Sequence, residues 1–258
     1  MLRLEDSKQF NQEIIIRAAH HSEENDRIAE AIKLYNLAGD YSTVVSCLAQ
    51  ALGNTISQSS PDEKARAIEK TAADILRHYE RTNRAVGKNR EAVIKLLRIR
   101  EALDAKNSGK PDVALEVHPV FLLVRFLMVT YYMVQIMEST DLIPLAGDVA
   151  KTTRRAEEFK DLHETLQRNL QTYLTLTMDA LAAIQQRVKS SAVGDTTRQM
   201  VRFPHVHILP VVLIWLVKTL SSVRRKSRSL MVFAGILKYR MSPDVYSYLA
   251  RLDVEIAL

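Results

Sequence analysis

Apolar residues recur three or four positions apart along most of this sequence, which is the spacing of one face of an α-helix. The clearest case is residues 27–52, where Ile28, Ala31, Ile32 and Tyr35 share one face. After a short turn a second apolar stripe follows, which contains Val44 or Val45, Leu48 and Leu52. Two amphipathic helices with so short a connection predict an antiparallel helical hairpin.

The turn of this hairpin is predicted at Gly39, Asp40 and Tyr41. Glycine adopts the left-handed conformation that commonly ends a helix without a clash at Cβ, so Gly39 is a typical stop. The carboxylate of Asp40 is suited to accept hydrogen bonds from the first free amides of the next helix. We interpret these three residues as architecture and not as an active site.

Helical spacing continues to the end of the chain, and no long run alternates between apolar and polar residues. Ser60, Pro61 and Glu63 form a capping-box pattern that predicts a helix reaching about Asn83. Ser242, followed by Pro243, predicts the start of the last helix. The longest regular stripe contains Leu166, Leu170, Leu174, Thr177, Leu181 and Ile184.

The fold expected from these patterns is all-α. The first hairpin does not recur at a 34-residue spacing, which argues against a tetratricopeptide array. We therefore expect an irregular, elongated stack of antiparallel helices, similar to an α-solenoid, in a single helical domain over residues 1–258.

Composition agrees with a folded helical protein. The chain has 258 residues, 47% hydrophobic and 26% charged, and only seven glycines and seven prolines, which is few for a chain rich in tight turns. Its net charge is +6, but 30 acidic residues are interspersed with 36 basic ones, so charge argues only weakly for nucleic-acid binding. The single cysteine, Cys47, allows no intramolecular disulfide and fits a reducing compartment.

Candidate catalytic chemistry is sparse. The glycines form no phosphate-binding loop, and the pair His205 and His207 lacks further metal ligands nearby in sequence. Cys47 lies within an apolar stripe and is predicted to be a core residue, while Glu157 and Asp161 have a spacing that is routine on solvated helix faces. We predict no catalytic, cofactor-binding or metal-binding residues and no enzymatic activity.

Two apolar segments are too short or too charged to cross a membrane. Residues 117–137 are interrupted by Arg125 and Gln135, and residues 208–217 fall well short of the roughly 20 apolar residues a spanning helix needs. Both are predicted to be buried core helices, so we expect no transmembrane span.

One compact basic run consists of Arg224, Arg225, Lys226 and Arg228. Such a run is commonly a solvated helix surface. The alternative is a contact patch for nucleic acid or an anionic membrane surface. Both interpretations stay open at the level of sequence.

Three ordered blocks of the sequence resemble one protein family. Residues 31–45 (AIKLYNLAGDYSTVV) resemble a helical hairpin in the carboxy-terminal half of the nucleoporin-interacting-component family, the large inner-ring scaffold nucleoporins of the nuclear pore complex. Residues 141–178 resemble the penultimate helices of that family, and residues 225–240 (RKSRSLMVFAGILKYR) resemble its terminal helix and turn. The resemblance covers about residues 10–258.

This resemblance implies a structural constituent of the nuclear pore complex, located at the nuclear envelope, that supports nucleocytoplasmic transport of protein and mRNA. Its expected partners are other inner-ring scaffold and linker nucleoporins, the linkers binding as short helices in apolar grooves. The resemblance implies no small-molecule substrate or cofactor and argues against nucleic acid. Family members are much longer, so the chain corresponds to their carboxy-terminal part, without the amino-terminal coiled coil that recruits the central channel nucleoporins.

Residues 200–220 (MVRFPHVHILPVVLIWLVKTL) depart from the family pattern as an atypical apolar insert. They stand where the family has a short variable connection, and they contain two prolines and the only tryptophan, Trp215. The insert is either a lineage-specific helix or translated unspliced sequence, and we hypothesise the latter.

The unspliced-sequence hypothesis predicts that mature transcripts lack most of this insert. Sequencing of processed message across codons 195 to 225 tests it directly. A mature transcript that retains the segment contradicts the hypothesis and leaves the lineage-specific helix.

Overall fold

The computed structural model of this protein describes residues 2–56, 62–84, 89–108, 130–145, 148–193 and 209–258. Every regular element in these ranges is a helix, and no strand occurs within them. The all-α prediction is therefore confirmed. Contacts divide the chain into two compact units, Met1–Leu97 with His163–Leu166, and Arg98–Leu162 with Gln167–Leu258. The single domain over 1–258 and its elongated shape stay predictions.

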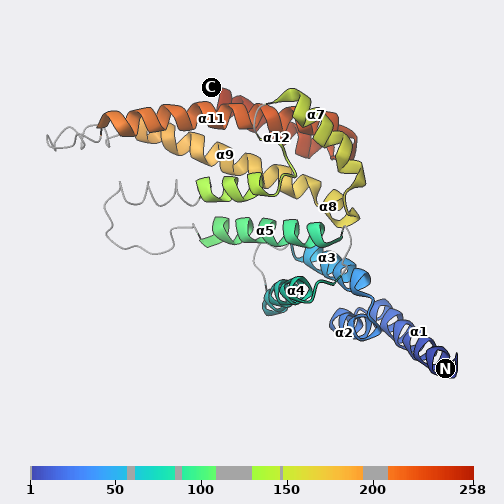
Figure 1. The fold of residues 1–258 in the computed structure, drawn as a ribbon. Coiled ribbons are helices and arrows are strands. Elements are labelled where there is room, and N and C mark those ends of the chain that lie inside the picture. The colour runs from blue at the N-terminus through green and yellow to red at the C-terminus, as the bar shows by residue number, and fades with distance from the viewer. Residues whose placement is uncertain (1, 57–61, 85–88, 109–129, 146–147, 194–208) are drawn as a thin grey trace. The chain divides into compact units, whose positions relative to one another are not determined.

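Unit 1 is built from helices that pack in sequence order (Figure 1). They are α1 (Leu2–Glu24), α2 (Ile28–Ala38), α3 (Tyr41–Ile56), α4 (Glu63–Arg81) and the first part of α5 (Asn89–Ser108). Helix α1 packs on α2, α2 on α3, and α3 on α4. This nearest-neighbour order is typical of stacked helices, in which each helix covers the apolar face of the one before it.

The core of unit 1 forms where the stripes read from the sequence meet. Tyr35, Val44 and Leu48 are fully buried. Two hydrogen bonds to one carboxylate link the helices around this core. The hydroxyl of Tyr35 donates to Glu23 Oε2 at 2.8 Å, and Cys47 Sγ donates to Glu23 Oε1 at 3.6 Å. One glutamate thereby joins α1, α2 and α3.

Helix α4 begins later than the sequence predicts. Its N-cap is Asp62, whose Oδ1 accepts a hydrogen bond from the amide of Ala65 at 2.7 Å. The prediction that Ser60 caps this helix is wrong, because aspartate is an equally good cap and stands nearer to the first apolar residue. Ser60 and Pro61 lie outside the described residues. The helix ends at Arg81, just before the predicted Asn83.

Unit 2 contains the remaining helices. They are the last part of α5, helical residues 130–139, α7 (Val149–Glu158), the 3₁₀ turn η1 (Phe159–Asp161), α9 (Leu170–Val193), α11 (Leu209–Ile236), the 3₁₀ turn η2 (Lys238–Arg240) and α12 (Pro243–Ala257). The short α8 (Glu164–Arg168) is divided between the two units. Helices α9, α11 and α12 contact one another pairwise, and α11 also contacts α7 (Figure 1).

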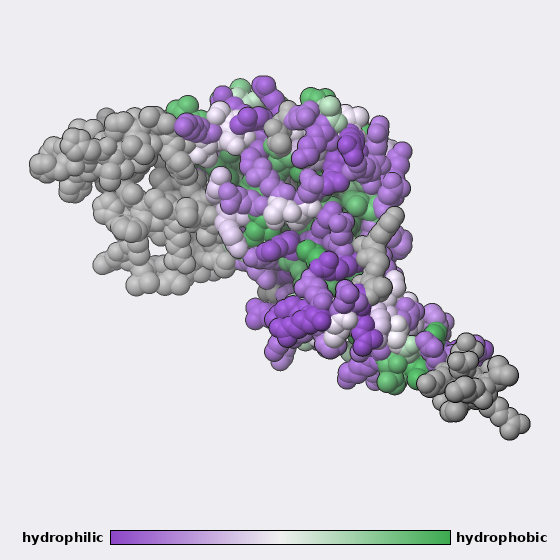
Figure 2. All heavy atoms as spheres, viewed as in Figure 1, coloured by the Kyte–Doolittle hydropathy of each residue, from purple (hydrophilic) through white to green (hydrophobic). Residues whose placement is uncertain are grey.

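The longest predicted stripe is confirmed as buried. Its residues from Leu170 onward lie in unit 2, whereas Leu166 belongs to unit 1. The six stripe residues, Leu166, Leu170, Leu174, Thr177, Leu181 and Ile184, are all buried, although a turn at Asn169 separates α8 from α9. An edge-to-face pair, Phe159 and Phe233, joins η1 to α11 with ring centroids 6.0 Å apart. Figure 2 shows hydrophilic side chains over most of the viewed surface, as expected for helices whose apolar faces point inward.

Two further predictions concern α11 and α12. The Oγ of Ser242 accepts from the amide of Val245 at 3.4 Å and Pro243 follows it, which confirms the predicted start of α12. Residues 200–208 of the apolar insert lie outside the described residues. Its remainder forms the start of α11, which continues without a break to Ile236.

Two glycines in different backbone conformations provide a matched stability test. Gly39 has φ of +79° and open space where a Cβ would stand, so Gly39→Ala introduces backbone strain alone. We expect a loss of about 1 kcal/mol in unfolding free energy. Gly235 is helical, and an added Cβ would meet Tyr246 Oη at 3.8 Å, so Gly235→Ala is expected to stabilise by about 0.5 kcal/mol.

Urea unfolding followed by circular dichroism measures both changes against the unsubstituted chain. Equal effects of the two substitutions contradict the assigned role of the left-handed residue.

Candidate functional site

The hairpin turn has the geometry of a helix stop followed directly by a helix start. The amide of Gly39 donates to Asn36 O at 3.2 Å and that of Asp40 to Tyr35 O at 3.0 Å, which is a Schellman motif. Asp40 then begins α3, since its Oδ1 accepts from the amide of Thr43 at 3.1 Å and its Oδ2 from the hydroxyl at 2.6 Å. Several backbone groups at both helix ends are therefore satisfied within the turn.

Tyr41, the third residue predicted at the turn, packs α3 against α4 through its side chain. Its ring packs edge-to-face on Tyr79 with centroids 5.0 Å apart, and the guanidinium of Arg84 lies 4.3 Å from its centroid. The hydroxyl of Tyr79 donates to Asn36 Oδ1 at 2.7 Å. Burial raises the pKa of this tyrosine hydroxyl to about 12. These contacts hold α2, α3 and α4 against one another, and the structural role of the turn stays a prediction.

A groove of about 680 Å³ lies between α2, α3 and α4 in unit 1. Its apolar lining comes from Ile28, Ile32, Leu48, Ile68 and Ile75, together with several alanines. Lys33, Lys64 and Asp62 stand among the polar residues of the lining. A groove with apolar walls between neighbouring helices is the kind of surface that accepts an amphipathic helix.

The basic run lies on α11, and one of its four cations points inward. Lys226 Nζ lies 2.7 Å from Glu138 Oε1, and its side chain is only 13% exposed. The serines that alternate with these cations are buried. Ser227 donates to Asp253, and Ser229 donates to the carbonyl of Pro144 at 2.8 Å.

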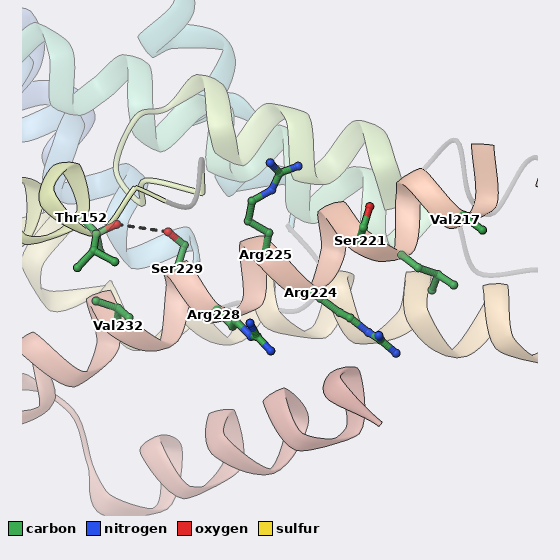
Figure 3. A pocket seen from close by; sticks show the side chains of 10 residues that line it. Thr152, Val217, Ser221, Arg224, Arg225, Arg228, Ser229 and Val232 are labelled. Carbon is green, nitrogen blue, oxygen red and sulfur yellow. Dashed lines mark hydrogen bonds between the residues drawn. The ribbon is translucent and has the colours of Figure 1, made fainter. Parts of the chain in front are cut away.

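The other three cations, Arg224, Arg225 and Arg228, are exposed. They line a groove of about 770 Å³ between α7 and α11. Figure 3 shows Arg224 and Arg228 pointing to the same side of α11, whereas Arg225 points to another side. The hydroxyls of Thr152 and Ser229, both in the lining, lie 3.3 Å apart and join the two helices (Figure 3).

The structure locates only some of the residues that were considered for metal binding or catalysis. Within them, no group of three or more histidine, cysteine, aspartate or glutamate side chains is placed to hold a metal ion. His205 and His207 lie outside the described residues. Glu157 and Asp161 do not share a regular helix, because α7 ends at Glu158 and η1 follows it.

Membrane-spanning character is also missing from the described part of the chain. None of the helices there combines the length and apolar character needed to span a bilayer. Most of the segment 117–137 lies outside the described residues.

Cys47 is a core residue, as predicted. Its side chain is 2% exposed, and burial, with Glu23 nearby, raises the pKa of its thiol to about 12. At about pH 8, such a pKa lowers the thiolate fraction by roughly three orders of magnitude relative to an ordinary cysteine.

We expect the native chain to react very slowly with a chromogenic aromatic disulfide at about pH 8. The same chain unfolded in guanidinium should react completely, since the thiol then has an ordinary pKa and full access. Rapid, stoichiometric reaction in native buffer would contradict the buried thiol.

Comparisons with known proteins identify relatives over nearly the whole chain. A family model described as Nup93/Nic96 matches residues 1–248. Nucleoporin NIC96 of Saccharomyces cerevisiae is 23% identical over 268 residues, covering 99% of this chain and 27% of the relative. Nuclear pore complex protein Nup93 of Danio rerio is 25% identical over 244 residues, covering 93% and 26%.

The fold has a counterpart of known structure. The crystal structure of Chaetomium thermophilum Nic96 SOL superposes with a TM-score of 0.67 at 20% sequence identity, covering 93% of this chain and 33% of that one. This likeness supports the all-α architecture. The chain spans about a quarter of the length of the curated relatives named above.

Proposed function

Because the chain belongs to the Nup93/Nic96 family, we propose that it is a helical scaffold module of the nuclear pore complex at the nuclear envelope. The observation that carries this proposal is the family match over residues 1–248, which includes helices of both compact units. The names of the yeast and zebrafish relatives, a nucleoporin and a nuclear pore complex protein, support it. In this role the chain contributes to nucleocytoplasmic transport by its structure.

The proposed role involves no catalytic turnover. A scaffold must hold its helices at fixed positions, and hydrogen bonds between the helices of this chain contribute to that. The Glu23 carboxylate joins three helices of unit 1, and Ser227 and Ser229 hold α11 to its neighbours in unit 2. Each buried hydrogen bond contributes on the order of 1 kcal/mol, and it also disfavours alternative packings, in which its partners would be left unpaired.

The proposed partners are other inner-ring scaffold nucleoporins and linker nucleoporins. The groove between α2, α3 and α4 is suited to a linker that binds as a short helix with an apolar face. Ile28, Ile68 and Ile75 are only partly buried in this groove, so a bound helix would remove more of their surface from water. This mode of binding needs no cofactor and no small-molecule substrate.

The alternative function is binding of nucleic acid or an anionic membrane through Arg224 to Arg228. The geometry favours the scaffold function over it, since Lys226 is paired with Glu138 and Arg225 points away from Arg224 and Arg228. A phosphate-binding surface commonly gathers its cations on one face.

Affinity capture tests the proposal with a matched pair of variants. The tagged chain, Ile68→Glu in the groove and Ile94→Glu on α5 are each incubated with nuclear-envelope extract, and bound nucleoporins are identified by mass spectrometry. Ile94 is 37% exposed and does not line the groove, so it controls for the added charge. We expect the unsubstituted chain and Ile94→Glu to recover inner-ring nucleoporins, and Ile68→Glu to recover at least about fivefold less of a linker.

The outcomes separate the two levels of the proposal. Recovery of no pore proteins by the unsubstituted chain contradicts the scaffold function. Equal recovery by both variants, with unchanged circular dichroism, contradicts only the assignment of the groove.

A further inference from the structure

We propose that the groove between α7 and α11 binds an acidic amphipathic helix of a partner protein. This inference rests on the proposed scaffold function for the class of partner. It adds a second surface, in unit 2, and specifies the chemistry of the helix that the surface accepts.

A single stripe of α11 forms one wall of this groove. Its members follow at helical spacings of four, three, four and four residues: Val217, Ser221, Arg224, Arg228 and Val232. At a rise of 1.5 Å per residue the stripe is about 22 Å long, or about four helical turns. The stripe is apolar at both ends and cationic in the middle. A helix of about 16 residues lying alongside α11 would match its length.

The apolar ends of the groove are open to solvent. Val217 is 64% exposed and Val232 is 37% exposed, and Val149 of α7, on the facing wall, is 63% exposed. Branched aliphatic side chains at these exposures gain free energy when a partner covers them. They therefore favour apolar residues at both ends of the bound helix.

The middle of the stripe favours negative charge on the bound helix. Arg224 and Arg228 stand one turn apart on the same side of α11 (Figure 3), and like charges at that spacing repel each other. In the described part of the chain, neither guanidinium has an ion-pair partner. Two carboxylates at positions i and i+4 of a facing helix have the same spacing and would neutralise both.

Arg224 is already held in place for such a contact. Its Nε donates to the carbonyl of Ile256 in α12 at 3.3 Å, and its two terminal nitrogens keep donors that a carboxylate can use. A guanidinium whose position is fixed in advance loses less conformational freedom when it binds.

Acidic side chains around the groove are engaged elsewhere. Asp148 accepts hydrogen bonds from the first amides of α7, and Asp253 accepts from Ser227. Arginines on the neighbouring helix behave differently, because Arg154 and Arg155 of α7 are both paired with Glu158 and lower its pKa. The two arginines of the α11 stripe thus contrast with a neighbouring pair that is neutralised within the chain.

The same geometry explains why an acidic helix fits better than a phosphate polyanion. Three exposed valines gain nothing from contact with a charged sugar-phosphate backbone or with lipid headgroups, whereas they match the apolar face of a helix. Only Arg224 and Arg228 share the stripe, because Arg225 points to another side of α11 and Lys226 is paired with Glu138.

Fluorescence anisotropy with the full 258-residue chain tests the inference. The probe is a labelled helical peptide of about 16 residues, with leucines at both ends of one face and two glutamates at i and i+4 in its centre. A second peptide replaces these glutamates by glutamine, and a third has the first composition in scrambled order. We expect the first peptide to bind at least about tenfold more tightly than either of the others.

Variants at exposed positions locate the binding. Arg224→Glu with Arg228→Glu should weaken binding of the first peptide at least about tenfold, and Val217→Ser should weaken it about threefold. The matched control is Arg66→Glu with Lys70→Glu, an exposed i, i+4 pair on α4, which should leave the affinity unchanged. Circular dichroism verifies that each variant keeps its helical content.

Several results would overturn the inference. They are equal affinity for the glutamate and glutamine peptides, equal losses in the α11 and α4 variants, and tighter binding of a single-stranded RNA oligomer or phosphatidylserine vesicles that is lost in the α11 variant. Because capture of nucleoporins is measured separately, any of these results leaves the scaffold function standing.

Discussion

Each helix of this protein carries an apolar stripe that it cannot bury alone, and its packing onto a neighbour is the constraint on which the structure depends. In unit 1 the stripe of α2 ends at a left-handed Gly39, and the chain reverses so that the stripe of α3 can meet it. In unit 2 the stripes of α9, α11 and α12 meet pairwise. Water is excluded where these apolar faces pack together, so only the remaining helix faces are exposed to solvent and accessible to partners.

Hydrogen-bonded polar atoms between the packed helix faces make one alignment of the helices more favourable than others. Apolar contacts alone tolerate small shifts of one helix along another, whereas a buried hydrogen bond requires one alignment. Glu23 sets the register of α1 against α2 and α3 through Tyr35 and Cys47. Burial and this carboxylate raise the pKa of the Tyr35 hydroxyl, which therefore stays a donor even at a pH at which an ordinary tyrosine ionises. Ser227 and Ser229 act similarly on α11, which explains small polar residues inside a basic run.

Both grooves result from the packing of helices. Where the apolar faces of neighbouring helices pack together, a groove remains between their outer faces. The groove of unit 1 has mainly apolar walls, whereas that of unit 2 has arginines between valines. Two surfaces of different chemistry in one chain agree with the proposed scaffold function, in which each groove accepts a different class of helix. Under the proposed scaffold function, both surfaces are available to partners in the nuclear pore complex.

Local patterns in the sequence were enough to predict the helical class, the hairpin turn at Gly39 and Asp40, the buried stripe from Leu166 to Ile184 and the start of α12. Helix propensity, capping and periodicity are properties of neighbouring residues along the chain. The sequence also indicated the family. Packing in three dimensions was needed to show that Lys226 turns inward to Glu138 and that Arg224 and Arg228 face a groove with valines at its ends. Those features depend on which helix lies opposite, and a one-dimensional pattern of apolar and polar residues does not record it.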